Sequence, residues 1–225
     1  MNNNYSQRLL IFGINSLAEL LKYYIEKYTN GIISGFILDK EYLDNYPNKI
    51  DNIPIICFDN IEKIFPVKEY SILLALGYSN MNELRMEKYD IIKQKGYNIA
   101  SFVHPTASVQ QEFIEEGTIV LENTVIQPFV KMGVCNIFWS NVNISHHTVI
   151  GDFNYFAPMC SCCGNVTIGS QCFIGSNCTV KNGVKLADKT LAGAGVYISH
   201  DTFEADVIVP QRSITLTNKK SYDML

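Results

Sequence analysis

Apolar runs and amphipathic stretches alternate along the first half of the chain. Residues 17–28 and 83–95 have helical periodicity, 61–65 fits one helical turn, and the apolar runs 8–12, 32–38, 53–57, 71–76 and 98–103 predict strands. We expect Ser16 to cap the first helix. Strands that alternate with helices indicate an α/β domain with a parallel sheet, in which ligands bind at the carboxyl ends of the strands.

Those strand ends carry few residues with binding chemistry. The first turn, Gly13-Ile14-Asn15-Ser16, has one glycine where a dinucleotide-binding turn has three. It is equally compatible with a phosphate-binding turn and with a strand-to-helix turn that binds nothing. Asp39 follows the second strand and can accept a hydrogen bond from a ribose or a base, or simply end a loop, and Gly77 follows the fourth strand.

The periodicity changes in the second half of the chain. Every sixth residue from 114 to 186 is apolar: Ile114, Val120, Ile126, Met132, Phe138, Ile144, Ile150, Phe156, Cys162, Ile168, Ile174, Val180 and Leu186. A period of six belongs neither to an α-helix nor to a simple alternating strand. It is typical of a parallel β-helix with three flat faces, in which about eighteen residues complete one coil.

A second column of small, β-branched or short polar residues stands four positions after each member of the first, from Thr118 to Thr190. A narrow coil needs small side chains there, because stacked strands lie only about 4.8 Å apart. Four clustered cysteines fall on these two columns, where cysteine serves as a small apolar residue: Cys160, Cys162, Cys172 and Cys178. Their spacing matches no common zinc motif, so we interpret the cluster as core and expect no metal site.

Composition and charge narrow the function class. The 225 residues are 47% hydrophobic, with 18 basic against 22 acidic side chains and a formal net charge of −4. This excludes a disordered chain and disfavours nucleic-acid binding. No apolar run is long enough to span a membrane and the first residues are polar, so we expect no membrane contact and a cytoplasmic location. We divide the chain into a sheet domain (1–103), a β-helix (104–212) and a tail (213–225).

The repeats carry a family resemblance. The segments IGSQCFIGSNCTV (168–180), HHTVIGD (146–152), CCGNVTIG (162–169) and the link FVHPTASV (102–109) are similar to those of the sialic acid O-acetyltransferase-like sugar acyltransferases. The family includes N-acetyltransferases of nucleotide-linked amino sugars and O-acetyltransferases of sialic acid. The resemblance implies a left-handed parallel β-helix, preceded by a small Rossmann-like domain that binds the sugar nucleotide.

The resemblance also selects a general base. In β-helix acyltransferases the catalytic histidine stands five residues before a glycine such as Gly151, which identifies His146 here. Histidine suits proton transfer near neutral pH. Gly164 lies one coil of eighteen residues beyond His146, so its N–H should stand beside the imidazole, where an oxyanion needs a donor. The family's acetyl-binding segment, here Cys162-Cys163-Gly164, identifies the same residue. His104 in the link is expected to be structural and His200 to lie on the surface.

The chain departs from the family next to the base. An acidic residue often follows the catalytic histidine, whereas this chain has His147, which we include in the catalytic set; Asp152 or Glu122 is a possible substitute for the carboxylate. Many relatives have an asparagine seven residues before the base, where this chain has Trp139, with Asn141 close by. The tryptophan can stack on a sugar or a partner subunit, or fill a corner.

The resemblance implies acetyl-CoA as co-substrate, bound between the β-helices of a homotrimer along the later coils. The expected contacts are backbone groups and basic side chains: Gly164, Gly175, Gly193, Ala194, Gly195, Lys181, Lys185 and Arg212. The acceptor nucleotide is expected at Gly13, Asn15, Ser16, Asp39 and Gly77, with Trp139 and Asn141 near the sugar. Each basic side chain is also compatible with an ordinary surface charge.

These observations predict an enzyme that moves an acetyl group from acetyl-CoA to the amine of a nucleotide-linked amino sugar, for surface polysaccharide synthesis. Transfer is direct, because no cysteine or serine is paired with a base in a nucleophile motif. One alternative is O-acetylation of sialic acid or another sugar hydroxyl. Another is a β-helix zinc carbonic anhydrase, which needs three histidine ligands.

Overall fold

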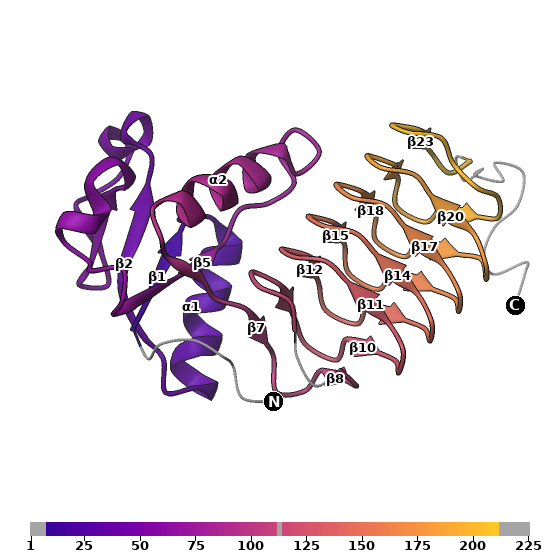
Figure 1. Ribbon diagram of the computed structural model, residues 1–225, viewed down its shortest axis with the longest axis horizontal. Coiled ribbons are helices and arrows are strands. Elements are labelled where there is room, and N and C mark those ends of the chain that lie inside the picture. Colours follow the sequence, from indigo (N-terminus) through magenta and orange to yellow (C-terminus); the bar gives the residue numbers. More distant parts are fainter. Residues whose placement is uncertain (1–7, 112–113, 212–225) are drawn as a thin grey trace, which may run out of the picture.

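The computed structural model describes residues 8–111 and 114–211, so the predicted tail and Arg212 lie outside the described residues. Figure 1 shows two parts side by side, a small α/β sheet with its helices and a stack of triangular coils that rises away from it. The sequence predicted both architectures, an α/β sheet and a parallel β-helix.

The N-terminal sheet has six strands in the order β3-β4-β2-β1-β5-β6. All neighbours are parallel except β3 and β4. The strands are β1 (Arg8–Phe12), β2 (Ile32–Leu38), β3 (Lys49–Ile50), β4 (Ile53–Cys57), β5 (Tyr70–Leu74) and β6 (Asn98–Ile99), and the helices are α1 (Ser16–Tyr28), α2 (Glu83–Gln94) and the 3₁₀ segments η1 (Lys40–Asn45) and η2 (Phe58–Lys63).

Both faces of this sheet are covered. Along β1, Leu9 and Ile11 pack in a cluster with α1, whereas Leu10 and Phe12 pack in a second cluster with η2 and α2. This explains why the central strand is apolar without alternation, as is usual for a parallel strand buried on both faces. The strand ends that the sequence singled out therefore form the accessible edge of the sheet.

The cap of α1 differs from the prediction. Asn15, not Ser16, is the N-cap: its Oδ1 accepts from the backbone N–H of Leu17 at 3.0 Å and of Ala18 at 3.1 Å. Its Nδ2 donates to the Ala75 carbonyl at 2.8 Å, which ties the turn to the end of β5. Both residue types cap helices well, and the contact with Ala75 favours the asparagine because an amide can donate and accept at once.

The β-helix is built from two-residue strands on three faces. We call these the docked face (β7, β9, β12, β15, β18, β21, β23), the second face (β8, β10, β13, β16, β19, β22) and the third face (β11, β14, β17, β20). The bounds are β7 (Phe102–Val103), β8 (Ser108–Val109), β9 (Ile119–Val120), β10 (Val125–Ile126), β11 (Lys131–Met132), β12 (Ile137–Phe138), β13 (Asn143–Ile144), β14 (Val149–Ile150), β15 (Tyr155–Phe156), β16 (Ser161–Cys162), β17 (Thr167–Ile168), β18 (Phe173–Ile174), β19 (Thr179–Val180), β20 (Lys185–Leu186), β21 (Leu191–Ala192), β22 (Tyr197–Ile198) and β23 (Val207–Ile208).

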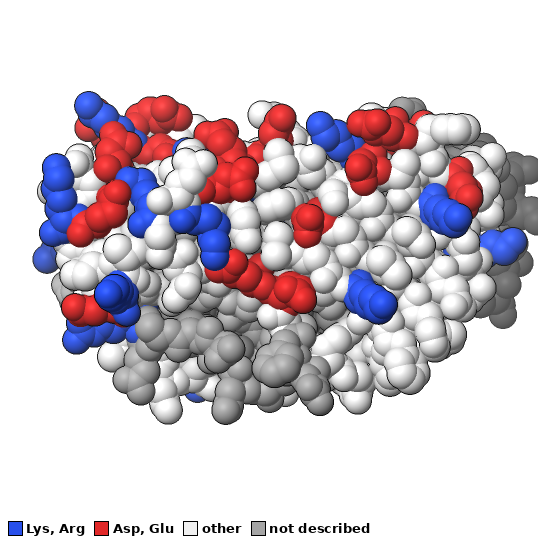
Figure 2. Space-filling view, in the orientation of Figure 1, with Lys and Arg blue, Asp and Glu red and all other residues white. Residues whose placement is uncertain are grey.

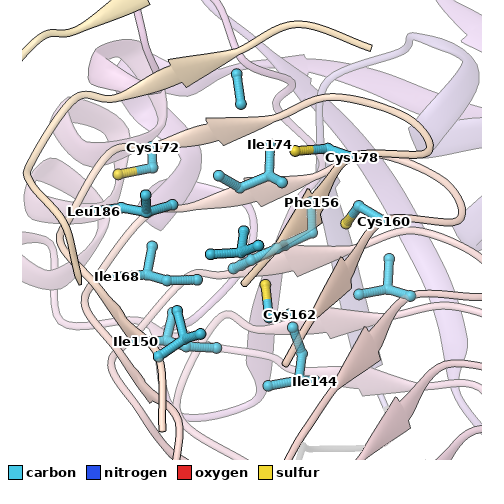
Figure 3. Close-up of a cluster of buried hydrophobic side chains, with 14 of the residues drawn as sticks. Ile144, Ile150, Phe156, Cys160, Cys162, Ile168, Cys172, Ile174, Cys178 and Leu186 are labelled. Carbon is cyan, nitrogen blue, oxygen red and sulfur yellow. The ribbon is translucent and has the colours of Figure 1, made fainter. Parts of the chain in front are cut away.

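The interior of the coil contains both predicted columns. Residues of the second column from Thr118 to Thr190 are all buried, and so are the apolar residues of the first column from Val120 to Leu186 apart from Met132, which is half-buried. Figure 3 shows Cys160, Cys162, Cys172 and Cys178 inside the coil among isoleucines. Burial raises the pKa of Cys172 to about 12 and that of Cys178 to about 11, which disfavours the thiolate that a nucleophile or a metal ligand needs.

Two boundaries differ from the prediction. The expected last strand of the sheet, 98–103, is two strands: β6 pairs with β5, whereas β7 pairs with β9 of the coil. The inward column also runs past residue 186, through Ala192 and Ile198, and resumes at Ile208. It resumes out of phase because the last coil is shorter: Ala192 pairs with Ile208, sixteen residues later.

One buried arginine makes several of the contacts between the two parts. Arg85 of α2 is 1% exposed, and its guanidinium donates to five backbone carbonyls. Leu76 and Gly77 accept at 3.3 and 2.7 Å from within the N-terminal part; Cys135, Phe153 and Asn154 of the coils accept at 3.2, 2.8 and 3.1 Å. Burial lowers its pKa to about 10, so it stays charged at neutral pH. We call this set of contacts the Arg85 clasp.

Candidate functional site

His146 and Gly164 lie on one edge of the β-helix, between the second and third faces, which we call the His146 edge. His146 is in the turn between β13 and β14, and Gly164 is in the turn between β16 and β17, one coil further. A Cβ placed on Gly164 would lie 2.6 Å from His146 Cε1 and 3.0 Å from Nε2. The imidazole therefore lies directly against the glycine backbone, and any side chain there would displace the ring.

The Gly164 N–H has no backbone acceptor in the described chain, although the residue is buried under the His146 ring. The N–H of Cys163 donates to the Val180 carbonyl and that of Asn165 to the His146 carbonyl, both at 3.0 Å. Between them, the Gly164 N–H donates to no backbone carbonyl among residues 8–111 and 114–211. An unpaired N–H beside an accessible imidazole provides a hydrogen-bond donor and a proton acceptor at one place, the pair that acyl transfer requires.

His147 contacts His146 through the ring nitrogens. The two Nδ1 atoms are 3.1 Å apart and both imidazoles are exposed. The His147 ring also lies on Phe129 of the preceding coil, with ring centroids 4.8 Å apart. The two carboxylates proposed as substitutes are engaged elsewhere: Asp152 accepts from the Val134 N–H at 2.8 Å and Glu122 accepts from the Ser140 hydroxyl at 2.6 Å.

A cleft opens at the carboxyl ends of β1, β2 and β5. It has a volume of about 200 Å³, and Gly13, Asn15 and Asp39 from the predicted set contribute to its wall. Sequence reasoning missed Lys88 of α2, whose Nζ lies 2.8 Å from Asp39 Oδ1. A lysine within a helix belongs to no recognisable sequence motif. Only its position on the face of α2 that packs toward the sheet could have identified it as a residue of the cleft. The other lining residues are Phe12, Ile14, Leu38, Tyr42, Tyr46, Leu76 and Leu84.

Not all the predicted nucleotide residues have side chains free to bind. Asn15 uses both ends of its amide in the cap and in the contact with Ala75. Gly13 adopts a φ of +109°, and a Cβ there would lie 3.0 Å from the Ala75 carbonyl, so it serves the turn itself. Ser16 is exposed in the first turn of α1, and Gly77 accepts from Arg85. The charged side chains of the cleft are thus Asp39 and Lys88, which are paired with each other.

Trp139 and Asn141 lie away from His146. They belong to the edge between the docked and second faces, which we call the Trp139 edge. From Asn141 to His146 is five residues along the coil, a distance of roughly 15 Å for extended backbone. Trp139 packs near Tyr155 at a centroid distance of 6.3 Å, and its Nε1 is buried. Asn141 is exposed, with a φ of +61°.

The predicted CoA contacts divide between the two edges. Gly175, Gly193 and Ala194 stack on the Trp139 edge, where a Cβ on Gly175 would lie 2.6 Å from the Ala194 nitrogen. Lys181 is exposed on the His146 edge, two coils above Ser145. The second face separates the two sets. A ligand that contacts both must therefore lie across this face, whose outward side chains are short or polar over most of its height.

The structure also places the other two histidines. His104 is 3% exposed, packs edge-on against Tyr24 and Tyr28, and is structural as expected; His200 is exposed. Within 8–111 and 114–211, no three His, Cys, Asp or Glu side chains are grouped as a metal site requires, and no helix is long and apolar enough to cross a bilayer. On the face that Figure 2 shows, acidic and basic side chains of the described residues are intermixed, without the continuous basic band typical of nucleic-acid binding.

Comparisons with known proteins agree with the repeats. Residues 165–200 match the family model described as "Hexapeptide repeat of succinyl-transferase". A 2,3,4,5-tetrahydropyridine-2,6-dicarboxylate N-succinyltransferase of Polynucleobacter asymbioticus is 29% identical over 45% of this chain and 36% of its own length. The GDP-perosamine N-acetyltransferase of Escherichia coli O157:H7 is 28% identical over 46% of this chain and 47% of its own length. The chain therefore spans less than half the length of these curated relatives.

A solved structure shows the same fold over almost the whole chain. The acetyltransferase domain of PglB from Neisseria gonorrhoeae, in complex with acetyl coenzyme A, superposes with a TM-score of 0.81. The match covers 91% of this chain and 97% of that one, at 18% sequence identity. The sheet and the hexapeptide-repeat coil thus occur together in a known arrangement.

Proposed function

We propose that the protein transfers an acetyl group from acetyl-CoA to the amine of a nucleotide-linked amino sugar. The observation that carries this proposal is the pairing of the His146 imidazole with the unpaired Gly164 N–H on one edge of the coil. The likeness to a sugar N-acetyltransferase over the coil and to an acetyltransferase structure over both parts supports the substrate class. Residues 1–103 then form a Rossmann-like nucleotide-binding domain, and 104–212 form a left-handed acyl-transfer domain.

The reaction uses the His146 edge as follows. The neutral amine attacks the thioester carbonyl carbon while His146 Nε2 takes the proton that the nitrogen loses. The carbonyl oxygen gains negative charge and accepts from the Gly164 N–H. The carbon–sulfur bond then breaks, the imidazolium returns its proton to the CoA thiolate, and the products are the amide and free CoA. Gly164 must be a glycine because its backbone and the ring occupy adjoining positions.

The acceptor and the donor are assigned to separate surfaces. The sugar nucleotide binds in the cleft at Asp39 and Lys88, where a lysine suits an anionic diphosphate and a carboxylate suits a ribose or base donor. Acetyl-CoA lies across the second face, within reach of Gly164, Gly175, Gly193, Ala194 and Lys181. Because the cleft and the His146 edge are on different sides of one chain, we propose a homotrimer in which a neighbouring copy completes each site. A cytoplasmic enzyme of surface polysaccharide synthesis fits these substrates.

A substrate panel tests the proposal. The purified protein is incubated with acetyl-CoA or, separately, succinyl-CoA and, in turn, UDP-, dTDP- and GDP-linked amino sugars, the matching free amino sugars and sialic acid, and released CoA thiol is measured. We expect turnover with at least one nucleotide-linked amine and none with its free sugar. Turnover only with a sugar hydroxyl would replace the N-acetyl assignment by O-acetylation, and turnover with succinyl-CoA alone would change the donor. No thiol release with any acceptor, from protein that binds acetyl-CoA, would overturn the proposal.

A further inference from the structure

His146 can act as a base only in one of its two neutral tautomers. The Cε1–Nε2 side of its ring lies against Gly164, with Nε2 3.0 Å from the position of a Cβ there, so a base that acts beside Gly164 needs the lone pair on Nε2 and the proton on Nδ1. The only ring nitrogen within hydrogen-bond distance of His146 Nδ1 among the described residues is Nδ1 of His147, at 3.1 Å. The direction of the hydrogen bond between the two rings therefore determines whether Nε2 of His146 can accept a proton.

We propose that His147 is a positioning residue which accepts the Nδ1–H of His146 and so keeps Nε2 free toward Gly164. In this state His147 carries its own proton on Nε2. The inference rests on the proposed function for its kinetic consequence, although the tautomer itself is a property of the resting protein. A neutral imidazole replaces the carboxylate that orients histidine in other acyl-transfer sites, so it sets the tautomer without adding negative charge.

The reverse hydrogen bond inactivates the site. If His147 Nδ1 is the donor, His146 must hold its proton on Nε2 and cannot accept another from the amine. Protonation of either ring in the resting pair has the same effect: it blocks Nε2 of His146 directly, or turns His147 from acceptor into donor. The active form is therefore the neutral pair in one of its two arrangements. During turnover the added proton resides on His146, whose Nδ1–H still donates to His147, so the geometry is kept.

Among residues 8–111 and 114–211, no charged side chain makes a hydrogen bond or ion pair with either ring. His147 packs on the neutral Phe129 ring, and the backbone N–H of His146 donates to the Gln127 side chain at 2.9 Å. The titratable groups stacked on this edge in the next two coils are the Cys163 thiol and the Lys181 ammonium, and no contact of either with the rings is present in the described chain. The nearest third-face charges by sequence are Lys131 and Asp152, and Asp152 is held by the Val134 N–H.

The column of turns that contains His147 supplies matched variants. His147 has a φ of +58°, and its equivalents one coil below and above, Phe129 and Asn165, have φ of +67° and +57°. Phenylalanine and asparagine are thus both compatible with this backbone. His147→Phe keeps an aromatic ring against Phe129 but removes the acceptor. His147→Asn retains a neutral acceptor, and His147→Asp supplies an anionic one.

The pH dependence of kcat separates these variants. We expect His147→Phe to lower kcat by about 10- to 100-fold, with KM for both substrates changed by less than about threefold, in line with loss of an orienting bond. His147→Asn should recover part of that loss. His147→Asp should move the acid limb of the profile to higher pH, because a carboxylate stabilises the imidazolium and His146 then holds its proton further up the pH scale. Asn123→Phe, at a left-handed turn of the first coil, serves as the control and should leave kinetics unchanged.

Nitrogen-15 NMR of imidazole-labelled protein tests the tautomer without any assay. We expect a protonated Nδ1 and an unprotonated Nε2 on His146 above the acid limb, and the reverse assignment on His147. A His146 that carries its proton on Nε2 overturns the inference even if acetyl transfer is found. A kcat and pH profile unchanged in His147→Phe would also overturn it. Absence of transfer with the expected tautomer present would instead count against the proposed function alone.

Discussion

The sheet and the coil assemble their chemistry by opposite routes. In the coil, His146 meets Gly164 because one turn takes eighteen residues, so the contact is a matter of counting along the chain. In the cleft, Asp39 meets Lys88 across 49 positions and two different kinds of element. A regular coil makes distant contacts readable from spacing, whereas a sheet with helices on both faces depends on how each helix happens to be oriented.

The outward residues of the coil show the same contrast on a smaller scale. On the docked face they are apolar, and in the coils next to the sheet they are covered: Ile119, Ile137 and Tyr155 are at most 7% exposed. On the third face they are exposed at Lys131, Val149, Thr167 and Lys185. All faces share the same interior pattern, so the outward position alone distinguishes a face that meets the sheet from a face that meets solvent.

The substitution His146→Ala tests most directly whether the contact of His146 with Gly164, one coil apart, forms the reaction site. If His146 is the base, we expect kcat to fall by about 10²- to 10⁴-fold, the usual contribution of general-base catalysis. Acetyl-CoA affinity, measured by calorimetry, should stay within about twofold. A variant that turns over like the wild type would remove His146 from the mechanism, and with it the assignment of Gly164.

Substitution of Arg85 tests how much the contacts between the N-terminal part and the coils contribute to stability. We expect Arg85→Met to lower the free energy of unfolding by about 3 kcal/mol or more, because several buried carbonyls lose their donor. Urea titration measures this. Lys93→Met is the matched comparison: Lys93 bridges the same two parts through Glu116 at 2.8 Å, but both groups are partly exposed, so we expect a loss of about 0–1 kcal/mol. Equal losses would contradict the central place of the clasp.

Gly164→Ala tests whether ring and backbone adjoin as described. The new methyl group would lie within 2.6 Å of His146 Cε1, so the imidazole must move. We expect kcat to fall by about 100-fold, comparable to loss of one oxyanion donor. Gly183→Asn, one coil further in the same turn, copies the residue found at Asn165 and should leave kcat unchanged. If both variants are fully active, the imidazole does not depend on that backbone.

Lys88→Met should have the smallest effect. The ammonium lies near the rings of Phe12 and Phe58, at 5.8 and 5.9 Å from their centroids, so methionine can occupy the same space. We expect KM for the nucleotide sugar to rise by about 5- to 10-fold with kcat and the KM for acetyl-CoA unchanged. A change in the acetyl-CoA KM instead would show that the cleft serves the donor.

Sequence reasoning placed elements better than it placed side chains. It located β1, β2 and β4 at their observed bounds and both columns of the coil, because burial on two faces and a six-residue period leave clear apolar patterns. It expected Ser16 to cap α1, whereas the cap is Asn15. The side chain of Asn15 also donates to the Ala75 carbonyl, which lies sixty residues away in the sequence and could not be foreseen. It also missed Arg85 and Lys88, since a charged residue within a helix looks like a solvated one until its neighbours in space are known.

The Arg85 clasp limits where this chain can be joined to a relative in a chimeric protein. A chimera that takes its N-terminal part from a relative needs a junction, and a junction near residue 103 separates the guanidinium of Arg85 from the carbonyls of Cys135, Phe153 and Asn154 that accept its hydrogen bonds. A chimera with that junction would bury the guanidinium of Arg85 without the carbonyl groups that accept its hydrogen bonds. A functional chimera should therefore keep α2 and the coils that contact it from the same parent protein. Only the strands and turns on the other side of the cleft should be replaced.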